Sequence, residues 1–193
     1  MFKSETIFFI LILISNVLIS GSLFPIIYIA AALLHEFGHL MAINALGHEI
    51  AGIKFVGFGI RIKNRNIFSY RQEILISAIG PITNFALATL SVLLSFIFSN
   101  ETLNHFIAAN IIYALINLVP IPPLDGYGIL SNFLYLRFSY QKVKTNIQVT
   151  TLILLIFLLF LFIFLLWKSY LNLSLLLILG ALIVNAFLLL LDK

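Results

Sequence analysis

Long apolar runs separated by short polar connections make up most of the chain, and each run is long enough for a helix that crosses a membrane. We expect spans at about 6–20, 24–46, 72–98, 103–119, 147–167 and 171–191. The first run follows Lys3 like a secretory signal, but we interpret it as a span. The pattern predicts one integral membrane domain over residues 1–193, of the all-α polytopic class with about six transmembrane helices.

The longest polar connection runs from about Gly47 to Arg71 and contains a second kind of pattern. Between Ile53 and Lys63, apolar side chains alternate with glycine and basic residues, as in a strand at a membrane edge. The alternation predicts a small β-hairpin or sheet after the helix at 24–46. A free strand edge there could pair with an unwound substrate. A hairpin that only plugs the cytoplasmic face explains the pattern equally well.

Composition agrees with a membrane protein and narrows the chemistry. Of the 193 residues, 62% are hydrophobic and 9% are charged, whereas roughly a quarter of the residues are charged in a soluble domain. No soluble domain of useful size fits between the predicted spans. The chain has no cysteine, so metal ligands must come from histidine, aspartate or glutamate.

The basic residues predict the orientation of the chain. If the spans alternate, one side of the membrane receives all lysines and arginines except Lys168. The positive-inside rule then places both termini, the long connection and the connection at 137–144 in the cytoplasm. We further expect a multi-pass protein of a bacterial cell membrane, with its active-site opening on the cytoplasmic side. This asymmetry accounts for the net charge of +4 without a nucleic-acid partner.

The candidate chemistry lies in the second span, at His35, Glu36 and His39. A helix brings residues four apart onto one face, so both histidines can bind one metal ion while Glu36 acts as a base toward water. Ionisable groups at membrane depth are costly unless they are paired. Their presence here predicts a functional site, with a polar network between helices as the less favoured interpretation.

A third ligand is expected at Asp125, which follows a spanning helix on the same side of the membrane as the end of the helix at 24–46. Three prolines, Pro120, Pro122 and Pro123, stop that helix before Asp125. The prolines leave backbone carbonyl and N–H groups without helical hydrogen-bond partners. Such groups are tolerated at membrane depth where the chain lines a cavity. Gly126 would let the backbone turn tightly beside the ligand.

Three motifs together resemble the site-2 protease family of intramembrane zinc metalloproteases. They are the histidine-glutamate motif, the Gly-Pro-x-x-Asn motif at Gly80, Pro81 and Asn84, and the Asn-x-x-Pro-x-Pro-x-Leu-Asp-Gly motif from Asn117 to Gly126. The motifs occur in the family's order, within a catalytic core of about 24–126. The chain looks like a compact form without a PDZ or CBS domain, similar to the sporulation branch that cleaves a membrane-associated sigma-factor precursor.

The resemblance implies a metalloendopeptidase with one Zn²⁺ per chain, held by His35, His39 and Asp125. Glu36 would activate water, and Asn117 would contact the substrate or the oxyanion. We expect Gly80, Pro81, Asn84 and Gly126 to be structural residues near the site, with Pro81 and Asn84 serving helix packing.

The implied reaction is regulated intramembrane proteolysis: hydrolysis of a peptide bond in or next to a transmembrane segment, with release of a cytoplasmic product. A transmembrane or membrane-associated protein is the expected substrate, with a sigma-factor precursor as one candidate and a regulatory membrane protein as a further candidate partner. Two alternatives stay open: a catalytically silent adaptor that binds membrane segments, and a metal permease. Intact Glu36 disfavours the adaptor, and polar residues gathered at one depth disfavour the permease.

Overall fold

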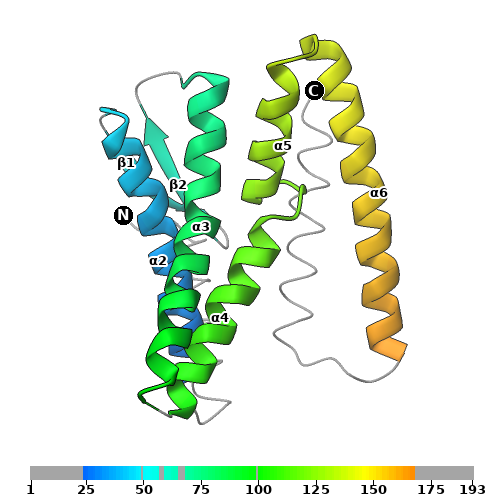
Figure 1. Cartoon of the computed structure of the whole chain (residues 1–193). Coiled ribbons are helices and arrows are strands. Elements are labelled where there is room, and N and C mark those ends of the chain that lie inside the picture. Colours follow the sequence, from blue (N-terminus) through cyan, green and yellow to red (C-terminus); the bar gives the residue numbers. More distant parts are fainter. Residues whose placement is uncertain (1–23, 49, 57–58, 65–67, 99, 168–193) are drawn as a thin grey trace. The chain divides into compact units, whose positions relative to one another are not determined.

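The computed structural model describes residues 24–48, 50–56, 59–64, 68–98 and 100–167 (Figure 1). In chain order these residues form helix α2 (Phe24–Ala45), strands β1 (Ile50–Val56) and β2 (Gly59–Asn64), and helices α3 (Tyr70–Ser95), α4 (Glu101–Asn117), α5 (Asp125–Tyr135) and α6 (Tyr140–Trp167). The chain groups into two compact units, Met1–Ile116 and Asn117–Lys193. That both units form the single membrane domain expected from the sequence stays a prediction.

Helices α2 and α3 pack against each other in the first unit. Gly38 allows this close packing, because a Cβ atom at Gly38 would lie 3.1 Å from the Thr83 Cβ and 3.2 Å from the Ile79 carbonyl oxygen. Nearer the end of α2, Ala42 and Ile43 form a buried cluster with Ile76. The close approach brings the polar residues of α2 within reach of the α3 backbone.

Helix α3 begins at a capping box. The Ser69 hydroxyl oxygen accepts from the Gln72 backbone N–H, and the Gln72 side-chain oxygen accepts from the Ser69 backbone N–H at 2.9 Å. These reciprocal bonds satisfy two backbone groups that a helix start leaves unpaired. The Gln72 amide nitrogen also lies 3.1 Å from His48 Nε2. The first turn of α3 is thereby tied to the segment that follows α2.

Strands β1 and β2 pair antiparallel, with Ile53 opposite Ile62 and Lys54 opposite Arg61. The predicted alternation from Ile53 to Lys63 is therefore divided between two strands. The register is irregular between Ile50 and Gly52, as at a β-bulge.

Three helices of the described residues are long and apolar enough to cross a membrane, over Pro25–Ala45, Tyr70–Ser95 and Tyr140–Leu161. Helices of this kind identify a membrane protein. Helix α4 has 17 residues, fewer than the roughly 20 of a usual crossing. The predicted spans at 6–20 and 171–191 lie outside the described residues. The total of six spans and the orientation of the termini thus stay predictions.

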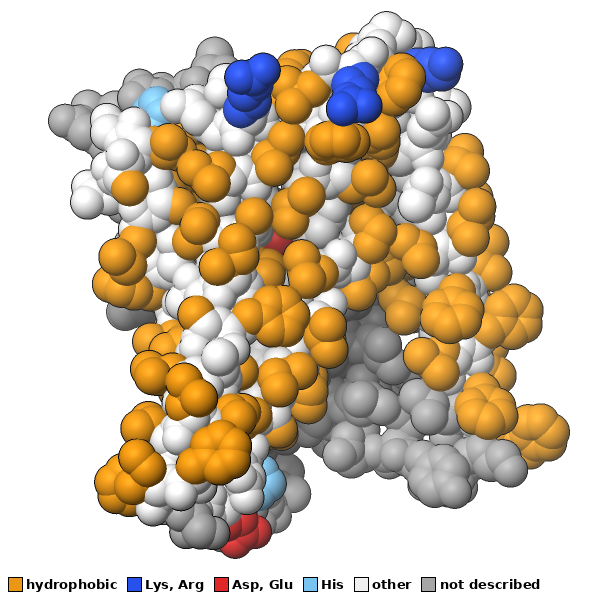
Figure 2. Space-filling model, viewed as in Figure 1, with side chains coloured by type: hydrophobic (Ala, Val, Ile, Leu, Met, Phe, Trp, Pro, Cys, Tyr) orange, Lys and Arg blue, Asp and Glu red, His pale blue; other side chains and the backbone are white. Residues whose placement is uncertain are grey.

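The surface of α6 shows why this chain suits a lipid environment. Its large apolar side chains are exposed along the helix, with Phe157 63% and Phe160 68% exposed, and Figure 2 shows hydrophobic side chains over much of the visible face. Soluble proteins rarely expose apolar surface on this scale. Acyl chains can cover it in a membrane.

In the second unit, the proline-rich segment before α5 packs on α6. Ile121 is fully buried and forms a cluster with Leu155 of α6, joined by Val119 and Leu124 of the same segment. The segment folds back on itself through hydrogen bonds from Ile121 N–H to the Val119 carbonyl and from Leu124 N–H to the Ile121 carbonyl, each 2.8 Å long. These contacts fix the start of α5, where Asp125 lies.

Candidate metal site

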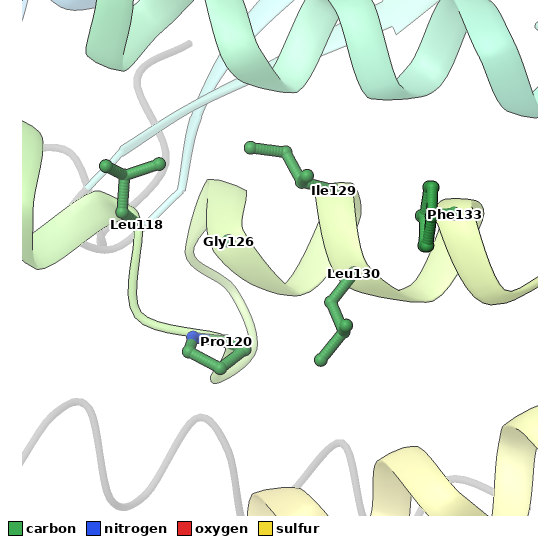
Figure 3. Close-up of a pocket in the computed structure, with 6 residues that line it drawn as sticks. All are labelled: Leu118, Pro120, Gly126, Ile129, Leu130 and Phe133. Carbon is green, nitrogen blue, oxygen red and sulfur yellow. The ribbon is translucent and has the colours of Figure 1, made fainter.

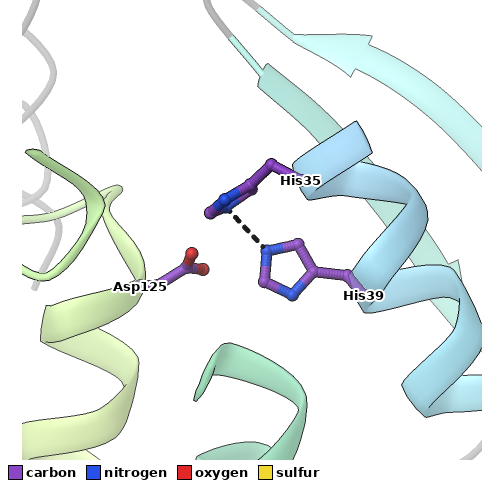
Figure 4. Close-up of side chains that lie close together, drawn as sticks. All are labelled: His35, His39 and Asp125. Carbon is purple, nitrogen blue, oxygen red and sulfur yellow. Dashed lines mark hydrogen bonds between the residues drawn. The ribbon is translucent and has the colours of Figure 1, made fainter. Parts of the chain in front are cut away.

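His35 and His39 lie one turn apart on α2 and are both buried, with exposed fractions of 2% and 7%. Their Nε2 atoms approach to 3.1 Å, and the two rings meet edge to face with an interplanar angle of 82° (Figure 4). The helical spacing of four residues produces this convergence directly. The pair of ring nitrogens predicted from the sequence is thus brought together.

The opposite nitrogen of each ring is held by a partner from α3. The His39 Nδ1–H donates to the Ile76 carbonyl oxygen at 2.8 Å, and the His35 Nδ1–H donates to Asn84 Oδ1 at 2.6 Å. A carbonyl oxygen only accepts, so each neutral ring carries its proton on Nδ1. Both Nε2 atoms then present lone pairs to one point.

This arrangement fits a divalent metal ion. A hydrogen bond between the two Nε2 atoms would require a second proton, and hence a positive charge, on one buried ring. A metal ion instead accepts both lone pairs. Two zinc–nitrogen bonds of about 2.0–2.1 Å at a tetrahedral angle would separate the nitrogens by about 3.3 Å, close to the 3.1 Å seen here.

Gly80 of α3 leaves the space that an ion would need. A Cβ atom at Gly80 would lie 2.6 Å from His35 Nε2 and 2.5 Å from His39 Cε1, and it would contact His39 Nε2 as well. Any side chain at this position would therefore compete with a ligand of the histidines. Gly80, expected only to lie near the site, forms one wall of it.

Asn84 has a larger role than the helix packing that we expected. It is fully buried, and its Oδ1 accepts from His35 while its amide nitrogen donates to the Ala31 carbonyl oxygen at 3.0 Å. Such partners orient the imidazoles of metal sites and fix their tautomer. Pro81, one turn earlier, is buried in α3, as packing requires.

Glu36 lies on α2 between the two histidines and is half-buried. The helix places a carboxylate beside the pair, on the same turn. Its role as a base was predicted from the sequence and stays a prediction.

The remaining predicted site residues lie in the second unit. Asp125 is the first residue of α5 and is half-buried (Figure 4), and a carboxylate in the first helical turn is stabilised by the helix dipole. Asn117 is the last residue of α4.

The reason that we gave for Gly126 was wrong. Gly126 is helical within α5; it makes no tight turn. A Cβ atom there would contact the Leu118 carbonyl group and lie 2.8 Å from the Val119 carbonyl carbon. Close approach of two backbone segments, and not a special backbone angle, explains the glycine.

An apolar pocket of about 290 Å³ lies beside these residues in the second unit. Leu118 and Pro120 line it from the proline-rich segment, and Ile129, Leu130 and Phe133 line it from α5, with Gly126 at its edge (Figure 3). The lining offers no charged group, so the pocket suits apolar side chains.

Sequence reasoning missed Asn110 and Tyr113 of α4. Asn110 is fully buried and accepts a hydrogen bond from Asn84 at 2.8 Å. The Tyr113 ring packs edge to face on His35, with centroids 5.0 Å apart. A buried asparagine in an apolar helix is itself a signal of a polar contact, and it could have directed attention to Asn110.

The chain is similar in sequence to a protein named as a zinc metalloprotease. No protein-family model matches it. A Bacillus subtilis (strain 168) protein named "Putative peptide zinc metalloprotease protein YydH" is 32% identical over 129 residues, which cover 63% of this chain and 51% of that protein. The chain therefore spans about half the length of the curated relative that it matches.

A solved structure, the site-2 protease from Methanocaldococcus jannaschii, shares the fold with a TM-score of 0.70. The match covers 94% of this chain and 86% of that one at 23% identity, which is informative about the fold alone. The chain is therefore similar in sequence to a protein named as a peptide zinc metalloprotease and similar in fold to a site-2 protease, and both findings support the resemblance that the three motifs predict.

Proposed function

We propose that the protein is a zinc-dependent endopeptidase of the site-2 protease type, which hydrolyses a peptide bond in or next to a transmembrane segment. The observation that carries the proposal is the convergence of two buried Nε2 lone pairs, 3.1 Å apart, against the open space at Gly80. A purely structural pair of histidines would not need that space. The similarity to a protein named as a peptide zinc metalloprotease supports the same chemistry.

We propose that Asp125 completes the ligand set. Its support is its position in the Asn-x-x-Pro-x-Pro-x-Leu-Asp-Gly motif and its place in the first turn of α5. A zinc dication with two neutral imidazoles, one ligand carboxylate and the carboxylate of Glu36 has a net charge of about zero. A neutral cluster is much less costly to bury than its separate charges.

The zinc ion would supply Lewis-acid chemistry, polarising the scissile carbonyl and acidifying water. Glu36 would take a proton from water and later give a proton to the leaving amine, as a general base and then a general acid. Asn117 would donate a hydrogen bond from its amide to the oxyanion that develops, a contact worth about 3 kcal/mol in other hydrolases. Each role belongs to a residue within one of the three motifs.

The proposed substrate is a transmembrane or membrane-associated protein, for which a sigma-factor precursor is one candidate, and the product leaves on the cytoplasmic side of a bacterial membrane. A helical substrate hides its carbonyls in hydrogen bonds, so the enzyme must hold the segment extended. The hairpin β1–β2 is a candidate for this task by strand addition. Proline at alternate positions of one strand should then abolish cleavage while the protein still folds.

Co-expression with tagged single-span substrates tests the proposal. We expect wild type to release a shorter product and Glu36→Gln to release none, while both accumulate in the membrane to the same level. Glu101→Gln, at the exposed start of α4, is the matched control and should cleave like wild type. Equal cleavage by Glu36→Gln and wild type would contradict the role of Glu36.

A further inference from the structure

Two buried asparagines connect His35 to helix α4. Asn84 of α3 and Asn110 of α4 are both fully buried, and their side chains are joined by a hydrogen bond from Asn84 Nδ2 to Asn110 Oδ1 at 2.8 Å. Asn110 Nδ2 in turn donates to the Phe106 carbonyl oxygen at 2.9 Å. No other part of the proposed mechanism uses Asn110.

Each hydrogen bond of this chain has a fixed direction. The Phe106 carbonyl can only accept, so Asn110 must turn its Nδ2 toward it and its Oδ1 toward Asn84. Asn84 must then direct Nδ2 to Asn110, and its second amide hydrogen goes to the Ala31 carbonyl oxygen. Only Oδ1 of Asn84 is left for His35, and it requires a donor there.

From this order we propose that Asn110 is a positioning residue of the metal site: it fixes the amide of Asn84 and, through that amide, keeps the proton of His35 on Nδ1. This inference rests on the proposed metal site. Without Asn110, only the Ala31 carbonyl oxygen would hold the Asn84 amide in this orientation, so a rotated amide that offers a donor to His35 would become more populated. The ring proton would then move to Nε2, where it would block the metal.

The test compares Asn110→Leu, which has nearly the same shape but no polar atoms, with Asn104→Leu. Asn104 is the same residue type on the same helix but is exposed. Asn110→Asp is the conservative variant, because a protonated carboxyl group can still accept from Asn84 and donate to the Phe106 carbonyl oxygen. All three are made in the full chain and purified in detergent, and size-exclusion chromatography checks that each is folded.

The first measurement is the tautomer of His35 in metal-free protein, taken from the nitrogen chemical shifts of isotope-labelled histidine. The chain has four histidines, so His48→Gln and His105→Gln leave only the pair at the site. The second measurement is zinc affinity by competition with a coloured chelator. We expect Asn110→Leu to populate the Nε2–H tautomer and to bind zinc about tenfold more weakly or worse, with Asn104→Leu unchanged and Asn110→Asp close to wild type.

An unchanged His35 tautomer in folded Asn110→Leu would overturn the inference, whether or not zinc affinity falls. If Asn110→Leu does not fold, the wild-type protein alone tests the inference. An Nε2–H tautomer of His35 in wild type would also overturn the inference. A wild type with the expected tautomer but no zinc binding would contradict the proposed function and leave the hydrogen-bond order intact. The two failures are therefore distinguishable.

Discussion

Replacing Gly80 with alanine should weaken metal binding with little effect on the fold of α3. The new Cβ atom would lie 2.6 Å from His35 Nε2 and 2.5 Å from His39 Cε1, much closer than the usual contact distance of about 3.5–4.0 Å. Alanine itself favours a helix over glycine by about 0.5–1 kcal/mol. A loss of zinc affinity in Gly80→Ala would therefore come from the change at the metal site and not from a less stable helix.

The size of the effect follows from the hydrogen bonds that hold the rings. To escape the methyl group, both imidazoles must move, and each ring then loses the bond at its Nδ1, to Asn84 or to the Ile76 carbonyl. Each buried hydrogen bond contributes about 1 kcal/mol, so the metal-bound state loses about 2 kcal/mol. At about 1.4 kcal/mol per factor of ten, zinc should bind roughly 30-fold more weakly.

Isothermal competition with a chelator of known zinc affinity measures this change in detergent-purified protein. Ala86→Ser is the control, since Ala86 lies on the exposed face of the same helix and also gains one heavy atom. Gly80→Ala with the zinc affinity of wild type would refute the reasoning, because the space at Gly80 would then not be the metal position.

Further predictions concern the supports of the site. Asn84→Leu should weaken zinc binding about 10- to 100-fold, since an outer-shell partner of His35 is lost, as read by chelator competition. Removing zinc with a chelator should lower the free energy of unfolding by about 2.7 kcal/mol relative to protein with free zinc at 100 times its dissociation constant, as a drop in melting temperature shows. Gly126→Ala should destabilise the protein by about 1–3 kcal/mol through overpacking against the Leu118 carbonyl, in the same melting assay. Ser69→Ala should cost about 1 kcal/mol through the lost cap of α3 and leave zinc affinity unchanged, because the Ser69 hydroxyl pairs with Gln72.

The helices were largely predictable because apolar runs of this length are typical of membrane-spanning helices. The span expected at 24–46 is α2 (Phe24–Ala45), and the span expected at 72–98 is α3 (Tyr70–Ser95). The start of α3 differs because the capping box at Ser69, not the first apolar residue, sets it. Helix α6 begins at Tyr140, before the predicted 147, because a polar first turn can be helical outside the apolar region.

The site was predictable only where its residues are close in the sequence. His35 and His39 meet because residues four apart lie on one face of a helix. This spacing can be read directly from the sequence. Their Nδ1 partners come from α3 at Ile76 and Asn84, and one of them is a backbone carbonyl with no sequence signature. Asn110 is 26 residues from Asn84, so only the packing of α3 and α4 reveals the connection.

The two glycines of the motifs, Gly80 and Gly126, were also only partly predictable from the sequence. Both residues were identified from their motifs, but a motif does not show which neighbouring atoms a side chain at that position would clash with. At Gly80 the missing Cβ leaves room between two imidazoles, and at Gly126 it admits a carbonyl group of the preceding segment. Both reasons depend on what lies opposite the residue in space.

The central claim is that His35 and His39 bind zinc through their Nε2 atoms. Zinc X-ray absorption on purified, stoichiometrically loaded protein tests it most directly. The account predicts one zinc per chain with two imidazole nitrogens at about 2.0–2.1 Å, and one imidazole fewer in His39→Ala. A zinc shell that contains no imidazole, or that is the same in His39→Ala as in wild type, would contradict it.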